Sequence, residues 1–415
     1  MGFRIFVMVC LVSVSLLWGE NKNTDNNKEL DLYAQSAVLM DADSGRILYG
    51  KNEDMVLANA STTKILTCIL ALEYGNIKDY VPVSSLAAKM PKVRLGMKEG
   101  QYFKLEDLLY SLMLESHNDS AVAIAEYIGG SVEGFAVMMN EKAKSIGCTN
   151  TYFITPNGLD AENGDKFHST TATDLSKIMS YCILKSPKKH DFLKVCTKDN
   201  YYFSDYVKNE SLFKSTGKNY GVHNKNAFLN MMEGVLAGKT GFTNKAGYCY
   251  VAALNEGERN FVVSLLACGW PNNKNYKWID TKNLFMYGLE NFQYENIITK
   301  VQLPVVKVVG GIPYANNCLN IYMCDNEEPF EVLLCKVDKV EVKVYLPKQV
   351  SAPIYKDEKI GEMKYYLNGE MIKVCEIKSK EEVQKHTFMW SLNYIFREWI
   401  FSKNYQKNVN YFYTT

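Results

Sequence analysis

Apolar residues change their spacing along the chain, and each change predicts where one type of element gives way to another. Short apolar runs at 37–40 and 47–49 flank the turn-rich segment 41–45, so they predict a β-hairpin. From Ser61 to about Lys185 the apolar spacing becomes helical. The first part of the chain is therefore predicted to hold one hairpin followed by a cluster of helices.

Strand patterns return after the helical region. Two apolar runs, 247–255 and 260–268, are linked by a short charged turn, and 281–292 has the apolar period of a closing helix. Strands at both ends with helices between them predict an α+β domain. The predicted domain covers residues 33–298. It holds one antiparallel sheet, whose strands come from the two ends of the domain, and a helical cluster that flanks the sheet.

The pattern changes again after about Thr299, where short runs of alternating polarity predict strands. These runs cover residues 301–309, 331–337, 340–345 and 361–366. Residues 299–380 are therefore predicted to form a small all-β domain, and they contain no obvious catalytic set.

The C-terminal tail, residues 381–415, has a stripe of large apolar side chains at helical spacing. The stripe consists of Phe388, Met389, Leu392, Ile395, Phe396, Trp399 and Ile400. Arg397 and Glu398 interrupt the segment, which is shorter than the roughly 20 residues that a bilayer span needs. The tail is therefore predicted to be an amphipathic helix lying on a membrane, with Lys403 and Lys407 meeting anionic headgroups. A helix packed on the β-rich domain has the same periodicity and stays open as an alternative.

The N-terminus has the pattern of a secretory signal. Arg4 precedes an apolar run, 5–18, which is too short to span a bilayer comfortably. We therefore expect residues 1–22 to be a signal peptide that is cleaved between Trp18 and Thr24, and the polar segment 23–32 to be a flexible lead. The expected location is secreted, on the outer face of the cytoplasmic membrane, with the tail as a peripheral anchor.

Composition limits the chemistry that the chain can carry. The 415 residues include 47 Lys plus Arg against 46 Asp plus Glu, a balance that argues against a nucleic-acid partner. The 5 histidines show no metal-binding spacing, so neither a metal nor another cofactor is expected. The 11 cysteines are scattered, which predicts mostly buried thiols, and only Cys318 and Cys324 are close enough together to suggest a disulfide.

Three short strings in a fixed order carry the candidate chemistry: Ser61-Thr62-Thr63-Lys64, Ser116-His117-Asn118 and Lys239-Thr240-Gly241. They match the S-x-x-K, S-x-N and K-T-G set of serine enzymes that are acylated by a peptide or a β-lactam. Other S-x-x-K strings lie in polar stretches, whereas Ser61 stands where an apolar helical period begins. On such a helix, the three-residue spacing places Ser61 and Lys64 on one face.

Each of these residues has a chemical task. Ser61 is a weak nucleophile unless a base removes its proton, and Lys64, if desolvated beside Lys239, can stay neutral enough to be that base. The backbone N–H of Ser61, near a helix start, can donate to the developing oxyanion. On an edge strand, Lys239 and Thr240 would offer a cation and a hydroxyl to a substrate carboxylate.

Longer stretches extend the resemblance to most of the chain. They are residues 41–49, 155–159 and 238–247. Over residues 33–378 the chain resembles a D-alanyl-D-alanine carboxypeptidase, a low-molecular-mass penicillin-binding protein. The resemblance implies a serine β-lactamase/transpeptidase-like domain followed by a β-rich domain. It also implies release of the terminal D-alanine from peptidoglycan stem pentapeptides through an acyl-enzyme on Ser61, and inhibition by β-lactam antibiotics.

The same resemblance assigns further roles within the strings. Ser116 is placed to relay a proton toward the leaving amine, and Asn118 to offer its amide to the substrate backbone. Phe242, which follows Gly241, supplies the second N–H donor to the oxyanion. The carboxylate contact of the third string would make the enzyme a carboxypeptidase.

Two positions depart from the family pattern. His117 stands where small residues are common, and it either narrows the cleft, adds a titrating group near Ser116, or points outward. Where relatives often carry an arginine after the third string, this chain offers Lys277, a point charge without the bidentate fork. Lys277 is therefore expected to hold the substrate carboxylate more weakly.

Other functions stay open from the residues alone. The same serine chemistry fits a D,D-endopeptidase that cuts peptidoglycan cross-links. A β-lactamase-like hydrolase would need a glutamate for its deacylating water, and no convincing Glu-x-x-Leu-Asn stretch follows the second string. A phosphate loop would need glycine at position 233, where the chain has Glu233. The intact Ser61/Lys64 pair argues against a catalytically silent wall-binding protein.

Overall fold

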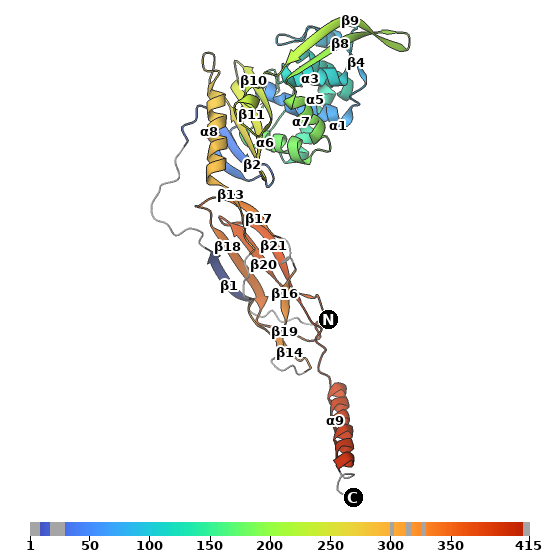
Figure 1. The fold of residues 1–415 in the computed structure, drawn as a ribbon, viewed down its shortest axis with the longest axis vertical. Coiled ribbons are helices and arrows are strands. Elements are labelled where there is room, and N and C mark those ends of the chain that lie inside the picture. The colour runs from blue at the N-terminus through green and yellow to red at the C-terminus, as the bar shows by residue number, and fades with distance from the viewer. Residues whose placement is uncertain (1–8, 17–29, 299–302, 313–316, 325–328, 410–415) are drawn as a thin grey trace. The chain divides into compact units, whose positions relative to one another are not determined.

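The computed structural model describes residues 9–16, 30–298, 303–312, 317–324 and 329–409 (Figure 1). The chain divides into two compact units. The first spans Asp25–Glu290, and the second contains Asn291–Thr415 together with strand β1 (Val9–Leu16). The helices of the first unit are α1 Lys64–Tyr74, α2 Ser85–Ala88, α3 Leu105–Leu114, α4 Asn118–Gly129, α5 Val132–Ile146, α6 Ala172–Ser180, α7 Lys189–Thr197 and α8 Tyr276–Asn291.

A five-stranded antiparallel sheet forms the centre of the first unit, with the strand order β10-β11-β12-β2-β3. Its strands are β2 Ser36–Asp41, β3 Ile47–Lys51, β10 Val235–Thr243, β11 Gly247–Glu256 and β12 Arg259–Leu266. The pairing of β2 with β12 runs from Ser36 opposite Leu266 to Asp41 opposite Phe261, so the two ends of the domain meet inside the sheet. The predicted α+β architecture is confirmed.

Helices cover both faces of this sheet, as Figure 1 shows for α8 and the helical cluster. On one face, Ser264 of β12 receives a hydrogen bond from Ser176 of α6, with 2.8 Å between the two hydroxyl oxygens. On the other face, a Cβ at Gly288 of α8 would lie 3.1 Å from Leu39 and 3.4 Å from Phe261. Because both faces are buried, the central strands are apolar at successive positions, which made them visible in the sequence.

A second, four-stranded sheet of the first unit has the order β4-β5-β8-β9. Its strands are β4 Tyr80–Pro82, β5 Tyr102–Lys104, β8 Asn200–Asn209 and β9 Leu212–His223. The apolar pattern of the sequence predicts no element for residues 200–223. Most side chains of the β8–β9 hairpin are exposed or half-buried and many are Lys, Asn or Ser, so the hairpin lacks the apolar alternation that marks a half-buried strand.

The second unit is the predicted all-β domain, with one sheet of order β1-β18-β20-β21-β16 and a smaller one of order β15-β14-β19. Its strands are β13 Gln293–Asn296, β14 Val306–Val309, β15 Cys318–Leu319, β16 Ile321–Met323, β17 Glu331–Leu334, β18 Val340–Pro347, β19 Gln349–Ser351, β20 Lys359–Leu367 and β21 Glu370–Ser379. Alternate residues of β18 are buried in its core. Cys318 and Cys324 both remain thiols, so the suggested disulfide is wrong. Cys318 is held in β15 opposite Lys307 of β14, whereas Cys324 follows β16 and donates its backbone N–H to Glu376 O of β21, in the other sheet.

Strand β1 pairs antiparallel with β18, from Val9 opposite Pro347 to Leu16 opposite Val340. These residues fall within the segment 1–22 that the sequence predicts to be a signal peptide. Cleavage of that segment would remove β1 and leave this side of β18 without its partner. The signal peptide itself stays a prediction.

Helix α9 (Phe388–Val409) follows the all-β domain. The seven side chains of its apolar stripe are exposed, from Leu392 at 41% to Phe388 at 80% accessible. The choice between a helix that lies on a membrane and one that packs on the β-rich domain stays a prediction. Among the helices described, none is by itself long and apolar enough to cross a bilayer, and α4 with α5 reaches that length only as a pair bent by 82°.

Candidate active site

Ser61 lies in a 3-10 turn, Ala60–Thr63, that leads into α1. Buried side chains hold this turn. Asn59 Nδ2 donates to the hydroxyls of Thr62 at 3.1 Å and Thr63 at 2.9 Å, and Thr63 Oγ1 donates to Ala60 O at 2.8 Å. The nucleophile candidate therefore stands on a turn that its neighbours fix through side-chain hydrogen bonds.

Lys64, the first residue of α1, is completely buried next to Ser61. Its Nζ lies 2.8 Å from Ser61 Oγ, 2.9 Å from Asn118 Oδ1 and 2.7 Å from Asn157 O. Burial, and then the nearby charge of Lys239, hold the pKa of Lys64 well below its usual range. A neutral amine has two N–H groups and one lone pair. Donation to Asn118 and Asn157 leaves the lone pair for the Ser61 hydroxyl.

Lys239 lies on β10, the edge strand of the central sheet. It is nearly fully buried, and its Nζ lies 3.0 Å from Ser116 Oγ and 2.9 Å from Thr240 O. Burial lowers the pKa of Lys239 to about 7. The second and third strings are therefore joined by a hydrogen bond between Lys239 and Ser116.

Gly241 allows β10 to approach the turn that carries Ser61. A Cβ at position 241 would lie 2.9 Å from Ser61 N, 3.0 Å from Asn59 O and 3.1 Å from Ala60 Cβ. Such separations are too short for a side chain at this position unless the backbone moves. Glycine therefore sets the distance between the nucleophile and the edge strand.

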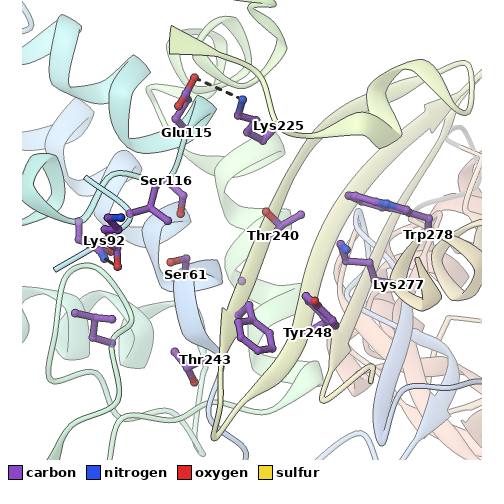
Figure 2. A pocket seen from close by; sticks show the side chains of 15 residues that line it. Ser61, Lys92, Glu115, Ser116, Lys225, Thr240, Thr243, Tyr248, Lys277 and Trp278 are labelled. Atoms are coloured by element: carbon purple, nitrogen blue, oxygen red, sulfur yellow. Dashed lines mark hydrogen bonds and ion pairs between the residues drawn. The ribbon is translucent and has the colours of Figure 1, made fainter. Parts of the chain in front are cut away.

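A cleft of about 390 Å³ opens above these residues (Figure 2). It is lined by Ser61, Lys92, Val93, Glu115, Ser116, Asn118, Leu159, Lys225, Thr240, Gly241, Phe242, Thr243, Tyr248, Lys277 and Trp278. In Figure 2, Ser61 lies between Ser116 and the strand that carries Thr240. Seven of the nine predicted site residues thus line one cleft, while Lys64 and Lys239 lie buried beside it and bond to Ser61 and Ser116.

The first residues of α4 connect one wall of this cleft to Lys64 through hydrogen bonds. Asn118 accepts a hydrogen bond from Lys64 at its Oδ1, and its Nδ2 lies 3.4 Å from the carbonyl oxygens of both Pro91 and Lys92. The buried Asp119 accepts from the backbone N–H groups of Leu95 and Gly96, each at 2.9 Å. Asp119 lies outside the three strings and was not among the predicted site residues.

The position of His117 differs from two expectations, that it narrows the cleft and that it points outward. The side chain neither lines the cleft nor points outward, because it is buried at the start of α4. Its Nδ1 lies 2.8 Å from Ser111 Oγ, and its Nε2 lies 3.6 Å from Glu115 Oε2. Burial lowers the pKa of His117, which favours the neutral ring. The direction of the side chain is set by packing inside the helical cluster.

Lys277 of α8 lines the cleft beyond Thr240. Its Nζ lies 4.8 Å from the ring centroid of Tyr248 and 4.4 Å from that of Trp278, and it donates to the carbonyl oxygen of Lys274. Burial lowers the pKa of Lys277 to about 8. The position is compatible with the predicted carboxylate contact, which stays a prediction.

Asn157 is the functional position that sequence analysis missed. Its carbonyl oxygen accepts from Lys64 Nζ at 2.7 Å, and Ser61 Oγ lies 3.3 Å from the same oxygen. The next residue, Gly158, has a φ of +80°, and a Cβ there would lie 1.9 Å from Ala60 O. The stretch 155–159 was noted only for its resemblance, and a main-chain acceptor leaves no side-chain signature.

The described residues contain no group of three or more His, Cys, Asp and Glu side chains that could hold a metal ion. A buried lysine beside a serine, in a cleft bounded by an edge strand, defines the site of a serine acyl-transfer enzyme.

A family model described as D-alanyl-D-alanine carboxypeptidase matches residues 21–267, more than half of the chain, and one described as penicillin-binding protein 5, C-terminal domain, matches 328–385. The chain belongs to the D-alanyl-D-alanine carboxypeptidase family of serine peptidases, which acts in peptidoglycan metabolism.

Individual relatives cover most of the chain. It is 30% identical over 379 residues to D-alanyl-D-alanine carboxypeptidase DacF of Bacillus subtilis, a match that covers 89% of this chain and 91% of that protein. It is 28% identical over 238 residues to a D-alanyl-D-alanine endopeptidase of Pseudomonas aeruginosa, covering 56% and 71% of the two chains. The structure of penicillin binding protein 5 from Haemophilus influenzae matches with a TM-score of 0.63 at 24% identity, covering 86% of this chain and 99% of that one, and supports the fold.

Proposed function

We propose that this protein removes the terminal D-alanine from peptidoglycan stem pentapeptides through an acyl-enzyme on Ser61. The observation that carries the proposal is the completely buried Lys64. Its Nζ lies 2.8 Å from Ser61 Oγ and has two further acceptors, Asn118 Oδ1 and Asn157 O. These contacts orient the lone pair of a neutral amine toward the hydroxyl that it must deprotonate.

In the acylation step, Ser61 Oγ attacks the carbonyl carbon of the penultimate D-alanine while its proton moves to Lys64 Nζ. The backbone N–H groups of Ser61 and Phe242 are the proposed donors to the oxyanion. The amide bond then breaks, and the proton that Lys64 took is relayed through Ser116 to the amine of the leaving D-alanine, which returns Lys64 to its neutral form. The Ser116 hydroxyl lies 3.0 Å from Lys239 Nζ. Water then attacks the ester carbonyl while Lys64 takes one of its protons. Lys64 returns this proton to Ser61 Oγ as the ester bond breaks, and the shortened peptide leaves with a free carboxylate.

The terminal carboxylate is proposed to lie against β10, near the Thr240 hydroxyl and the charges of Lys239 and Lys277. This arrangement favours a substrate whose leaving residue ends in a free carboxylate. A β-lactam presents a carbonyl and a carboxylate in the same way, so Ser61 would open its ring and become acylated. Of the described residues that line the cleft, Glu115 is the only carboxylic acid, and it lies 3.7 Å from Lys225 Nζ. The cleft therefore offers no unengaged carboxylate for rapid deacylation, which argues against a β-lactamase.

The test is labelling of the purified protein with a fluorescent penicillin, identification of the adducted peptide, and measurement of D-alanine release from a stem pentapeptide. We expect the adduct on Ser61 and loss of both activities in Ser61→Ala. Ser215→Ala is the matched control, because Ser215 is exposed and also begins an S-x-x-K string. Labelling of Ser61→Ala at the wild-type level would overturn the assignment.

A D,D-endopeptidase is the second candidate, and the match to the Pseudomonas aeruginosa endopeptidase favours it. The chemistry at Ser61 is the same, and the two functions differ in whether the leaving group is a free D-alanine or a cross-linked residue. Digestion of cross-linked muropeptides beside stem pentapeptides separates them. The carboxypeptidase proposal expects faster release from the pentapeptide.

We also propose that the protein is exported and held on the outer face of the cytoplasmic membrane by α9. Support comes from the apolar stripe of α9, whose side chains from Phe388 to Ile400 are exposed. A helix with one strongly apolar exposed face fits the interface between headgroups and acyl chains.

A further inference from the structure

His168 is buried, and both of its ring nitrogens make hydrogen bonds. Nδ1 lies 3.0 Å from Ile154 N and 3.2 Å from Thr155 N, and Nε2 lies 2.8 Å from Thr63 Oγ1. Backbone N–H groups can only donate, so Nδ1 accepts and the proton of a neutral ring is on Nε2, which donates to Thr63. Burial lowers the pKa of His168 to about 3, in agreement with a neutral ring.

The two nitrogens of the His168 ring bond to two different segments, one that holds Ser61 and one that contacts Lys64. On one side, Thr63 Oγ1 donates to Ala60 O at 2.8 Å, which closes the turn that holds Ser61. On the other side, Ile154 and Thr155 begin the segment that ends at Asn157, whose carbonyl oxygen lies 2.7 Å from Lys64 Nζ. The imidazole therefore connects the turn of the nucleophile to the segment that orients the base.

We infer that His168 is a positioning residue, which holds the Ser61 turn and the Asn157 carbonyl in register so that Lys64 faces Ser61. The inference rests on the proposed function. The ring does not contact substrate in this arrangement, since it lies beneath the turn and outside the lining of the cleft. A second bond, from Thr67 Oγ1 to Pro156 O at 2.6 Å, also ties α1 to this segment, so loss of the imidazole leaves the two elements attached.

Two substitutions of His168 each keep one of the two hydrogen-bonding functions of the imidazole. His168→Asn places an amide oxygen near the position of Nδ1 and can still accept from Ile154 and Thr155, but it is too short to reach Thr63. His168→Gln can donate to Thr63 but leaves the two backbone N–H groups without their acceptor. Thr63→Val removes the hydroxyl and keeps the shape of the side chain. The exposed His190, changed to Gln, is the control.

Each variant is titrated with fluorescent penicillin to count active sites, and kcat and KM for D-alanine release are then measured per titrated site. We expect kcat to fall on the order of 10- to 100-fold in His168→Asn and His168→Gln, because small misplacements of reacting groups have effects of this size. KM should stay within about 2-fold, since Thr240 and Lys277 are on other elements. His168→Asn/Thr63→Val should be no worse than the more severe single variant, because both changes break the same bond.

Two results would overturn the inference while leaving the proposed function intact. One is a lower count of titratable sites with an unchanged kcat per site, which is what a purely structural histidine predicts. The other is multiplication of the two single effects in the double variant. A wild-type protein that neither reacts with penicillin nor releases D-alanine would instead overturn the proposed function itself.

Discussion

Two buried lysines dominate the site at the scale of single residues. Lys64 is fully buried and Lys239 is 3% exposed. Their amines make hydrogen bonds to neutral oxygens of Ser61, Asn118, Asn157, Ser116 and Thr240. Burial disfavours the charged form of an amine, so the folded protein holds these groups in a state that water would not favour. Burial of the two amines therefore costs folding free energy, and the same burial keeps Lys64 neutral and reactive as a base.

Replacement of Lys64 by methionine tests its role as the base. Lys64→Met keeps an unbranched side chain in the core but removes the amine, so the fold should persist while Ser61 loses its proton acceptor. We expect the second-order rate constant of acylation by fluorescent penicillin to fall on the order of 10²- to 10⁴-fold. Lys225→Met, at the rim of the same cleft, is the control. A rate within a few-fold of wild type would make Lys64 a structural residue only.

Lys239 should make stability depend on pH. Its folded-state pKa of about 7 lies below the ordinary lysine pKa of 10.5, so between these two values the unfolded state binds more protons. The contribution of Lys239 to the free energy of unfolding is therefore smallest below pH 7 and rises toward pH 10.5. Relative to wild type, Lys239→Met should lose stability as pH rises through this window, by up to about 1.4 kcal/mol per pH unit.

Chemical denaturation at pH values from 6 to 10.5 measures this difference, with the exposed Lys214→Met as the control. A difference in unfolding free energy between wild type and Lys239→Met that stays constant with pH would show that Lys239 does not change its proton affinity on folding.

At the scale of elements, the site depends on the contact between β10 and the turn before α1. Gly241 permits this contact, because a Cβ there would lie 2.9 Å from Ser61 N. Gly241→Ala should push the strand and the turn apart by a few tenths of an ångström. We expect acylation to slow by about 10-fold or more, because reacting groups must be held within a fraction of an ångström.

Gly221→Ala on β9 is the matched control for this change. There, a Cβ would lie 3.0 Å from the ring of Tyr202, which is 71% exposed and can move aside. Stopped-flow acylation with a chromogenic β-lactam compares the two variants. Equal rates for both would mean that the close approach at Gly241 has no part in catalysis.

The elements also show what the sequence could reveal. The central strands were predictable because burial on both faces makes them continuously apolar, and Ser61 and Lys64 were predictable because side-chain chemistry at fixed spacing marks them. The β8–β9 hairpin was missed because its exposed faces carry polar residues without alternation. The direction of His117 depends on how the consecutive helices α3 and α4 pack, which brings Ser111 to its ring. The Asn157 acceptor is main chain, so neither feature shows in the apolar pattern.

At the scale of the whole molecule, the tail can be tested apart from catalysis. A chain that ends at Thr387 lacks α9 but keeps Lys385 and His386, whose backbones pair with Gly311 and Gly310. This truncation should release the protein from anionic vesicles and leave D-alanine release from a soluble peptide unchanged. Burial of the stripe at about 25 cal/mol per Å² would contribute several kcal/mol to membrane binding.

Point variants refine this test. Trp399→Glu places a charge on the apolar stripe and should weaken sedimentation with vesicles, whereas Asn393→Glu adds the same charge on the polar face and should have a smaller effect. Added salt should weaken binding without abolishing it. A truncated protein that still sediments, or a full-length protein that never does, would refute the anchor.

The joining of β2 to β12 affects when the enzyme can become active. Residues near position 36 find their partners only near position 266, and the Ser61 turn finds β10 only when positions 238–243 are available. A chain that crosses a membrane with its N-terminus first would therefore have no assembled site until most of the domain had emerged. Because these paired segments are far apart in the sequence, the chain would gain peptidase activity only after it had reached the compartment of its substrate.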